Sequence, residues 1–360
     1  MSKTLVEIDT MNALVLHGVG DARFEKIPKP GLEPGWVLIR VAFCGVCGSD
    51  LPRIFEKGTY RFPTVCGHEF AGTVEAVGEG VRAFQPGDRV AAFPLLWCGK
   101  CPACQASKFA QCRDYDYLGS RRHGAFAEFV AAPERNLVRV PEGVSLEEAA
   151  LTEPAAVARH ALQRAGGCRP GETVAIFGAG PIGLMTAMWA RAMGAGLVIL
   201  FDRVPEKIEL ARRMGFQEVH DSSRSAPVET VNRLTAGEGA EVCIEAAGVP
   251  ATLLDALASA KREGRVVLLG NPGSEVTLPA PLLSQAMRRE LKILGTWNSD
   301  FSDTGEEDDW RAALSAMASG QLDLKPLITH RVPLSGAWNA LKMMRDRSGF
   351  FCKVLIRPEA

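Results

Sequence analysis

The feature that most constrains the fold of this chain is a glycine-rich turn between an apolar run and a helical segment. Residues 173–177 (TVAIF) form the apolar run, and the hexapeptide GAGPIG at 178–183 follows directly. Residues 184–193 are mostly strong helix formers and end before Gly194. A glycine turn that joins a buried strand to a helix is typical of βαβ units in a doubly wound parallel sheet. We therefore predict an α/β fold for this part of the chain.

The same turn predicts a dinucleotide-binding site. Its glycines let a pyrophosphate approach the backbone, and the N–H groups at the start of the helix face that anion. Asp202 ends the next apolar run, nineteen residues beyond Gly183. A carboxylate there accepts hydrogen bonds from the adenosine ribose and repels a 2′-phosphate, which favours NAD over NADP; only Arg203 favours NADP. The predicted cofactor residues are Gly178, Gly180, Pro181, Ile182, Gly183, Asp202 and Arg203.

The pattern of apolar runs and turns divides the chain into two domains, as its length of 360 residues suggests. Residues 11–150 contain short β-rich runs at 13–17, 36–43, 72–77, 89–92 and 126–131, separated by Gly and Pro turns. This pattern predicts a compact, barrel-like β domain. Apolar strands alternate with helices from residue 157 to about 295, with strands expected at 173–177, 197–201, 242–245, 266–269 and 292–294. Ser145 is expected to cap a helix, and the end of the chain to form a helix at 310–319 and a strand at 353–356.

Four cysteines within fifteen residues form a second strong pattern. Their spacing allows four thiolates to close a tetrahedral cage around one zinc ion. Four unrelated reduced cysteines are the alternative, although such clustering is improbable for ten cysteines in 360 residues. Because four sulfurs leave no open coordination position, we predict a structural zinc site. Its ligands are Cys98, Cys101, Cys104 and Cys112.

A third pattern predicts a catalytic metal site near the start of the chain. Cys47 is flanked by Gly48 and precedes Ser49-Asp50, and His68 lies between Gly67 and Glu69. Lone cysteines and histidines are more often core residues than ligands. Glu153, however, is an acid at the start of an apolar helical run, and such an acid needs a partner. Cys47, His68 and Glu153 would give a zinc ion three protein ligands and leave a fourth position open.

Charge and composition exclude several classes of function. A net charge of -1 gives no overall field for nucleic acid or an anionic membrane, and no apolar run reaches the roughly 18 residues of a membrane span. The first ten residues contain acids where a signal peptide has an apolar core. We therefore expect a cytoplasmic protein whose cysteines are reduced thiols.

The ordered motifs resemble those of the zinc-dependent medium-chain dehydrogenase/reductase family along nearly the whole chain. The resemblance is carried by CGSD at 47–50, GHEFAG at 67–72, PGDRV at 86–90, the four-cysteine lobe, Glu153-Pro154 and GAGPIG at 178–183. It implies a GroES-like β-barrel catalytic domain, a Rossmann domain that binds NAD, and an active site in the cleft between them. The implied boundaries are 1–156 and 297–360 for the catalytic domain, with the zinc lobe at 94–115, and 157–296 for the Rossmann domain.

The resemblance also implies a reaction. Zinc held by Cys47, His68 and Glu153 binds a substrate hydroxyl, which is oxidised to a ketone with NAD⁺ as hydride acceptor. Glu69 is a possible further zinc ligand, and each chain would hold two zinc ions. Asp50 is expected to orient His68, and Ser49 to relay the hydroxyl proton.

Within the family, several segments resemble the dehydrogenases of polyol phosphates of the galactitol 1-phosphate type. One of Arg53, Arg121 and Arg122 is expected to bind a substrate phosphate, and for Arg121-Arg122 the alternative is a pair of solvated loop arginines. Oxidation of an unphosphorylated polyol such as sorbitol, of a simple secondary alcohol or of threonine remains open, as does a nucleotide-binding protein without catalysis. The resemblance implies a homodimer or homotetramer, built by Rossmann-domain strands near residues 294–297.

Overall fold

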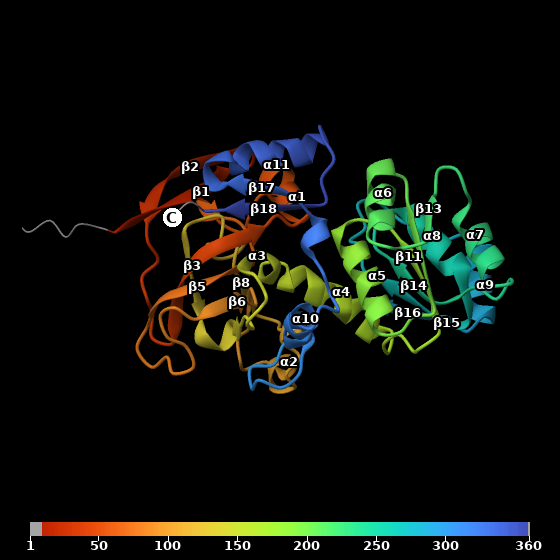
Figure 1. Ribbon diagram of the computed structural model, residues 1–360, viewed down its shortest axis with the longest axis horizontal. Coiled ribbons are helices and arrows are strands. Elements are labelled where there is room, and N and C mark those ends of the chain that lie inside the picture. The colour runs from red at the N-terminus through yellow and green to blue at the C-terminus, as the bar shows by residue number, and fades with distance from the viewer. Residues whose placement is uncertain (1–8, 359–360) are drawn as a thin grey trace, which may run out of the picture. The chain divides into compact units, whose positions relative to one another are not determined.

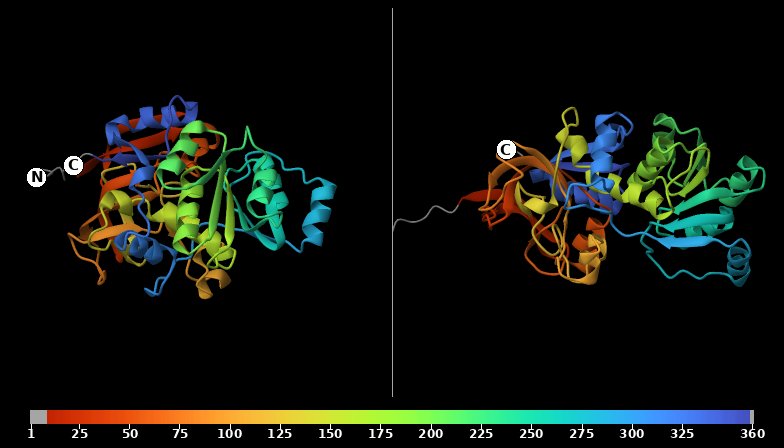
Figure 2. Two further views of the ribbon diagram at one scale, coloured as in Figure 1. Left: turned by 45° about the vertical axis from the view of Figure 1, so that its right-hand side comes forward. Right: turned by 90° about the horizontal axis from the view of Figure 1, so that it is seen from below.

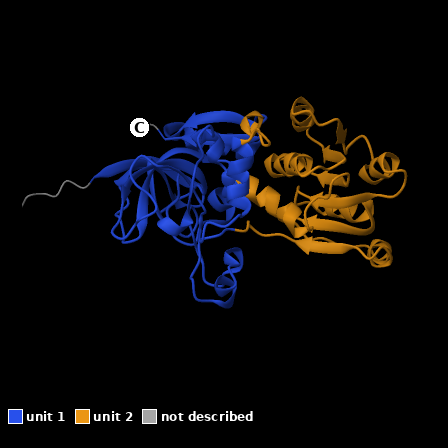
Figure 3. Ribbon diagram, turned by 60° about the horizontal axis from the view of Figure 1, so that its bottom comes forward, with its two compact units in different colours: residues 1–153, 301–318, 328–360 blue, residues 154–300, 319–327 orange. Residues whose placement is uncertain are grey.

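The computed structural model describes residues 9–358 and divides the chain into two compact units (Figure 3). The first unit comprises residues 1–153, 301–318 and 328–360, and the second comprises 154–300 and 319–327. The chain therefore leaves the first unit after Glu153 and returns to it at Phe301. No helix of residues 9–358 is long and apolar enough to cross a membrane.

The first unit is built on a seven-stranded sheet and a three-stranded sheet (Figure 1). The larger sheet has the order β10-β6-β5-β3-β18-β17, and β9 also pairs with β3. Its strands are β3 (Trp36–Gly45), β5 (Glu69–Val77), β6 (Arg89–Ala92), β9 (Phe129–Pro133), β10 (Leu137–Arg139), β17 (Ile328–Pro333) and β18 (Lys353–Arg357). The smaller sheet has the order β2-β1-β4, with β1 (Thr10–Gly18), β2 (Asp21–Pro28) and β4 (Thr64–Val65). The inward faces of these strands form one hydrophobic core, as the predicted β domain requires.

Short helices connect and cover these strands. They are α1 (Asp50–Pro52), the π-helix η1 (Arg53–Lys57), η3 (Glu134–Asn136), α3 (Leu146–Ala149), α10 (Asp309–Ala318), η5 (Leu334–Gly336) and α11 (Ala337–Asp346). Ser145 caps α3, as predicted: its hydroxyl accepts the Glu148 amide at 3.2 Å, and the Glu148 carboxylate accepts the Ser145 amide at 3.3 Å. The π-helix lies directly behind the predicted catalytic loop.

The four-cysteine lobe is anchored to the first unit by aromatic rings. It contains β7 (Leu95–Leu96), α2 (Pro102–Gln105), η2 (Phe109–Gln111) and β8 (Asp116–Tyr117). Trp97 stacks on Phe109 with ring centroids 4.1 Å apart, and Phe93 stacks on Phe301 at 4.5 Å. Trp310 of α10 packs edge-on against Phe93 at 5.6 Å. These stacked and edge-on aromatic rings thus pack the lobe against the rest of the first unit.

The second unit contains the predicted parallel sheet. All six strands run parallel in the order β13-β12-β11-β14-β15-β16, so the order reverses between β11 and β14. They are β11 (Thr173–Phe177), β12 (Leu197–Asp202), β13 (Glu218–Asp221), β14 (Ala240–Glu245), β15 (Ala260–Leu268) and β16 (Lys292–Gly295). In open α/β sheets, ligands bind beyond the carboxyl ends of strands at such a reversal. The predicted glycine turn follows β11 and therefore lies at that place.

Helices cover both faces of this sheet. Figures 1 and 2 show α5 and α6 on one face and α7, α8 and α9 on the other. Their bounds are α5 (Pro181–Ala192), α6 (Pro205–Arg213), α7 (Pro227–Leu234), α8 (Pro250–Ser259) and α9 (Ala280–Arg288); α4 (Thr152–Arg164) begins at the end of the first unit, and η4 is Lys325–Leu327. The sheet is thus doubly wound, as predicted.

One predicted strand is displaced. Residues 126–131 were expected to form a strand, whereas β9 starts at Phe129 and extends to Pro133. The backbone at 126–127 is also extended but pairs elsewhere: the Phe126 amide donates to the Cys66 carbonyl at 2.9 Å, and Ala127 bridges to Ala13. The first residues of the apolar run therefore pair with the smaller sheet and the later ones, in β9, with the larger sheet. The periodicity of the sequence could not predict this change of partner.

Candidate functional site

The loop between β3 and α1 holds Cys47 through the buried carboxylate of Asp50. Asp50 is fully buried, and its Oδ2 accepts the Cys47 amide at 3.0 Å. The Asp50 amide donates back to the Cys47 carbonyl at 3.0 Å. Ser49 points its hydroxyl at the Cys47 sulfur, with an Oγ–Sγ distance of 3.3 Å. The spacing of CGSD therefore forms a tight turn that presents the thiol.

His68 is brought to this loop by a glycine that no other residue can replace. Gly67 has φ of +92°, and a Cβ on it would lie 2.5 Å from the Phe126 ring and 2.8 Å from the Cys44 sulfur. His68 Nδ1 lies 3.5 Å from Asp50 Oδ1 and makes no hydrogen bond within residues 9–358. Burial lowers the pKa of His68, but the nearby Asp50 and Cys47 outweigh it, so its pKa is raised. The negative groups that stabilise the protonated ring would also stabilise a metal cation bound at this place.

Cys47, His68 and Glu69 form one group of candidate ligands. One ligand atom of each lies within 4.8 Å of those of the other two. Glu69 is 1% exposed, and its Oε2 accepts a hydrogen bond from Lys353 Nζ at 2.6 Å. Lys353 also donates to the Val46 carbonyl at 3.3 Å, so both members of this ion pair are fixed in the core.

Glu153 lies beside this group but outside the 4.8 Å cluster. It stands in the first turn of α4, is 7% exposed, and makes no hydrogen bond within residues 9–358. Burial raises the pKa of Glu153 to about 7, while the charges of His68 and Lys353 oppose that rise. A buried carboxylate without a hydrogen-bond partner is costly, and a cation would remove that cost.

The four lobe cysteines point their sulfurs at one another. All four Sγ atoms lie within 4.8 Å of one another, and the pairs Cys101–Cys104 and Cys98–Cys104 are 3.5 and 3.9 Å apart. None of the four forms a disulfide. Backbone N–H groups of Arg113 and Cys104 lower the pKa of Cys101 to about 6. Converging thiols with one readily ionised member match the donor set of a structural zinc ion.

The glycine turn after β11 has the shape expected of a phosphate-binding turn. A Cβ on Gly183 would lie 1.9 Å from the Gly178 carbonyl oxygen, so helix α5 can approach the strand only with glycine there. Asp202 at the end of β12 accepts the Ala179 amide through Oδ2 at 2.8 Å. Its Oδ1 accepts the amides of Arg203 and Val204 at 2.7 and 2.9 Å, and the Arg203 side chain is exposed. Asp202 thus ties the glycine turn to the next strand and places a negative charge beside it.

Comparison with known proteins decides the family. Residues 33–142 match the alcohol dehydrogenase GroES-like domain, and residues 181–319 match the zinc-binding dehydrogenase domain. A galactitol 1-phosphate 5-dehydrogenase of Escherichia coli K12 is 35% identical over 322 residues, which cover 89% of this chain and 92% of the relative. The chain belongs to the zinc-dependent medium-chain dehydrogenase/reductase family. It is therefore an oxidoreductase that acts on alcohols, as the motifs predicted.

Other members of the medium-chain dehydrogenase family are similar to a comparable degree. A sorbitol dehydrogenase of Bacillus subtilis is 34% identical over 354 residues, covering 97% of each chain. The crystal structure of galactitol-1-phosphate dehydrogenase from Escherichia coli superposes with a TM-score of 0.91 at 34% identity, covering 97% of this chain and 100% of that one. A zinc-binding dehydrogenase from Sinorhizobium meliloti, solved bound to NADP, has a TM-score of 0.89 at 32% identity and covers 97% and 100%.

Two residues of this dehydrogenase site escaped the sequence-based prediction. Lys353 is a charged residue at the start of the apolar run VLI in the strand KVLIR, and a charge beside an apolar run is the signal that drew attention to Glu153. Tyr117 places its ring edge-on to His68, with centroids 5.8 Å apart. Tyr117 follows Asp116 in the two-residue strand β8, so the two side chains extend from opposite faces of the strand. This alternation of a polar and an aromatic residue was the only sequence signal that Tyr117 faces the site.

The three predicted phosphate-binding arginines have different surroundings. Arg53 donates from Nη1 to Asp50 Oδ1 at 2.9 Å and keeps its other N–H groups available. Arg121 lies between the rings of Tyr60 and Tyr115, 4.3 and 4.4 Å from their centroids. Arg122 pairs through Nε with Asp116 at 2.6 Å and lines another cavity of about 440 Å³ that contains Trp36. Of the three arginines, only Arg53 contacts Asp50, the carboxylate that lies beside His68.

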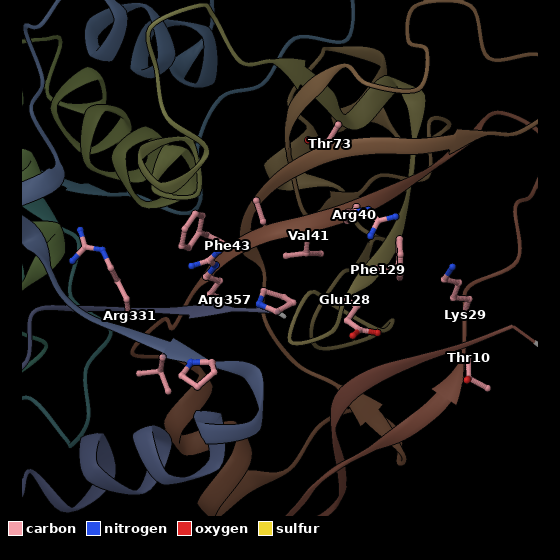
Figure 4. A pocket seen from close by; sticks show the side chains of 14 residues that line it. Thr10, Lys29, Arg40, Val41, Phe43, Thr73, Glu128, Phe129, Arg331 and Arg357 are labelled. Carbon is pink, nitrogen blue, oxygen red and sulfur yellow. The ribbon is translucent and has the colours of Figure 1, made fainter. Parts of the chain in front are cut away.

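A larger cavity of about 840 Å³ on the first unit has no candidate ligand among its lining residues (Figure 4). Its rim carries four cations, but three of them are paired: Lys29 with Asp9, Arg40 with Glu75 and Arg331 with Glu147. The lining carboxylate of Glu128 balances the fourth, Arg357, in overall charge. This cavity is therefore electrically balanced, and none of its lining residues belongs to the candidate metal group.

Proposed function

We propose that this chain is an NAD-dependent dehydrogenase that oxidises a secondary hydroxyl of a polyol or polyol phosphate to a ketone. The observation that carries the proposal is the group of Cys47 with the buried His68 and Glu69, and the unpartnered carboxylate of Glu153 beside it. This donor set fits a zinc ion, since thiolate, imidazole and carboxylate are its usual protein ligands. The lobe of four cysteines accounts for a second zinc per chain.

Cys47, His68 and Glu153 would hold the catalytic zinc in this proposal, and Glu69, which is paired with Lys353, is a possible further ligand. When bound, the zinc ion would supply Lewis acidity that lowers the pKa of a substrate hydroxyl toward neutrality. Asp50 Oδ1 lies 3.5 Å from His68 Nδ1, so this carboxylate would orient the ring and leave Nε2 for the metal ion. Lys353 neutralises Glu69 and keeps the total charge of the site from becoming strongly negative.

The hydroxyl proton has a path through Ser49. Its Oγ lies 3.3 Å from Cys47 Sγ, so it borders the position where the substrate oxygen binds. Ser49 is exposed, and a hydroxyl can accept one proton while donating another. Ser49 Oγ therefore carries the proton from the substrate oxygen to solvent, and the nicotinamide cofactor supplies the hydride acceptor.

NAD rather than NADP is the proposed cofactor. Asp202 is only partly exposed and takes three backbone N–H groups, so its charge is fixed where the adenosine ribose of a bound dinucleotide would lie. A fixed carboxylate favours ribose hydroxyls and repels a 2′-phosphate. Arg203, the feature that favours NADP, is exposed and its charge acts on Asp221. The NADP-bound relative makes a direct comparison of both cofactors necessary.

A phosphate on the substrate is proposed to bind Arg53 or Arg121. Arg53 uses one N–H group on Asp50 and can offer the others; Arg121 lies between two tyrosine rings and uses one N–H group on the Tyr115 carbonyl. Planar guanidinium groups bind phosphate with two parallel hydrogen bonds. Galactitol-1-phosphate, sorbitol and threonine dehydrogenases are all similar to this chain at 33–35% identity, so oxidation of an unphosphorylated polyol or of threonine is the second candidate.

The test is NADH formation at 340 nm across a panel of polyols, their phosphates, threonine and simple secondary alcohols. Parallel assays with NADP⁺ test the cofactor preference. The proposal expects the highest kcat/KM for a polyol or polyol phosphate with NAD⁺. Turnover of threonine alone, or of monohydric alcohols alone, contradicts it.

A homodimer, alone or paired into a tetramer, is the proposed assembly, and the cytoplasm is the proposed compartment. Strand β16 ends the sheet of the second unit; Ile293 on this strand and Trp297, two residues beyond it, are 47% and 56% exposed. An unpaired edge with exposed apolar side chains favours pairing with another chain. Light scattering of the wild type and Ile293→Glu tests this, with a monomeric wild type as the contradicting result. All ten cysteines are free thiols, which suits a reducing compartment.

A further inference from the structure

We infer that the Tyr117 hydroxyl selects vicinal diols, by hydrogen bonding to the substrate hydroxyl next to the one that is oxidised. The inference rests on the proposed function and adds a specificity-determining residue to it. Tyr117 stands on β8, whose pairing with β7 sets Tyr117 opposite Leu95. Its ring lies edge-on to the imidazole of His68, with centroids 5.8 Å apart and planes at 69°.

Hydrogen bonds fix the backbone around Tyr117. The Tyr117 carbonyl accepts the amides of Arg121 and Arg122 at 2.9 and 3.0 Å. The next residue, Leu118, is buried and donates its amide to the Pro94 carbonyl at 2.9 Å. On the opposite face of the strand, Asp116 pairs with Arg122. These bonds fix the backbone from which the Tyr117 ring extends to lie against His68.

The surroundings of the phenol make it a hydrogen-bond donor without a protein partner. Its hydroxyl makes no hydrogen bond within residues 9–358, and the side chain is only half-buried. A phenol carries one O–H donor, and this one belongs to a ring that lies against His68, beside the candidate metal group.

The chemistry of the substrate supplies the missing partner. In a polyol, every carbon next to the oxidised one carries a hydroxyl, which loses water on entering a half-buried site. The Tyr117 O–H can donate a hydrogen bond to that hydroxyl, whereas a substrate that lacks the hydroxyl leaves the Tyr117 donor unpaired. A monohydric alcohol of the same shape gains nothing from Tyr117. The contact therefore distinguishes polyols from simple alcohols without any contribution from a phosphate.

The test compares 2,3-butanediol with 2-butanol, which differ by one hydroxyl, on the zinc-loaded full chain with NAD⁺. Tyr117→Phe keeps the ring on His68 and removes only the oxygen. We expect it to lower the ratio of kcat/KM for the diol to kcat/KM for the alcohol by about five- to tenfold. Tyr115→Phe, the same change two residues away, is expected to leave this ratio unchanged. An equal loss on both substrates, or no loss on either, overturns the inference.

A binding measurement separates this inference from the proposed function. The dissociation constant of galactitol for the zinc-loaded protein without nicotinamide is measured by ligand-observed NMR for wild type and Tyr117→Phe. A rise of about fivefold in the variant supports the inference, and an unchanged constant overturns it. If the wild type oxidises no alcohol with NAD⁺ or NADP⁺, the proposed function fails while the binding result still decides the role of Tyr117.

Discussion

Lys353 Nζ lies 2.6 Å from Glu69 Oε2, and the two side chains are 3% and 1% exposed. They come from β18 and β5, more than 280 residues apart in the chain. Burial lowers the pKa of Lys353, but the charge of Glu69 outweighs it, so the ammonium stays protonated through neutral pH. One ion pair thus joins the last strand of the chain to the candidate metal group.

Removal of one partner should be far more damaging than removal of both. Lys353→Met leaves the Glu69 carboxylate buried without its cation, and we expect it to lower the free energy of unfolding by about 3–5 kcal/mol. Lys353→Met with Glu69→Gln leaves no isolated charge and should recover most of this loss. Urea denaturation of the zinc-loaded proteins measures both. A double variant as unstable as Lys353→Met would show that the pair does not stabilise through charge compensation.

The two predicted zinc sites can be emptied separately. Cys104→Ser and Cys47→Ser should each lower the zinc content from about two to about one per chain. Cys104→Ser should lower the midpoint temperature of thermal unfolding, because the lobe loses the zinc ion that cross-links its cysteines. Cys47→Ser should leave that midpoint closer to wild type but lower kcat by roughly 100-fold or more. Zinc analysis, thermal unfolding and assays check this, and two zinc ions in either variant would refute the assigned ligands.

Glu153 should make the stability of the metal-free protein depend on pH. Its pKa of about 7 lies above its ordinary value of 4.5, so the folded chain holds a proton that the unfolded chain releases in this window. Stability of the metal-free protein therefore falls as pH rises from about 4.5 to 7. Glu153→Gln has no proton to lose and should exceed the wild type by roughly 2–3 kcal/mol at pH 8. At pH 4.5 the two should be equal.

Denaturation of both metal-free proteins across this pH range measures the difference. Zinc should reverse the order, because the Glu153 carboxylate then has a cation to bind and Gln does not. A stability difference that stays constant from pH 4.5 to 8 would mean that Glu153 keeps its ordinary pKa.

The charge of Asp202 should set the cofactor preference. Asp202→Asn keeps one oxygen as an acceptor for backbone N–H groups and removes the negative charge. We expect the ratio of kcat/KM for NAD⁺ to that for NADP⁺ to fall by about tenfold or more. Glu206→Gln, an exposed acid on the following helix, is the matched control and should not alter the ratio. A wild type that prefers NADP⁺ would reverse the proposed assignment.

The arginines should distinguish phosphorylated from unphosphorylated substrates. Arg53→Ala and Arg121→Ala, tested singly, should raise KM for a polyol phosphate about tenfold or more, since each removes a charge-assisted hydrogen-bond donor. The unphosphorylated parent polyol is the internal control, because it uses no phosphate contact. Equal changes in KM for both substrates in both variants would show that the arginines act through the structure of the site. Arg53 requires this control most, because it also neutralises Asp50.

Local patterns predicted the elements of the second unit well. The run TVAIF became β11 with the predicted bounds, and the glycine turn opens α5 as expected. Both depend on short-range physics: an apolar run of strand length, and glycines that permit close contact of strand and helix. Strands β2, β13 and β17 were not predicted, because their exposed or alternating charged residues give no clear apolar period.

The sequence by itself determined the family, the doubly wound sheet and the candidate ligands, since each depends on residue types at fixed short spacings. It could not determine which distant residues meet. Glu69 gained Lys353 as a partner, and Tyr117 came to lie against His68, only through the folding of strands far apart in the chain. The pKa of Glu153 likewise depends on burial, which arises from the whole core. Spacing specifies chemistry within a loop, whereas contacts across strands and the exclusion of water are properties of the tertiary structure alone.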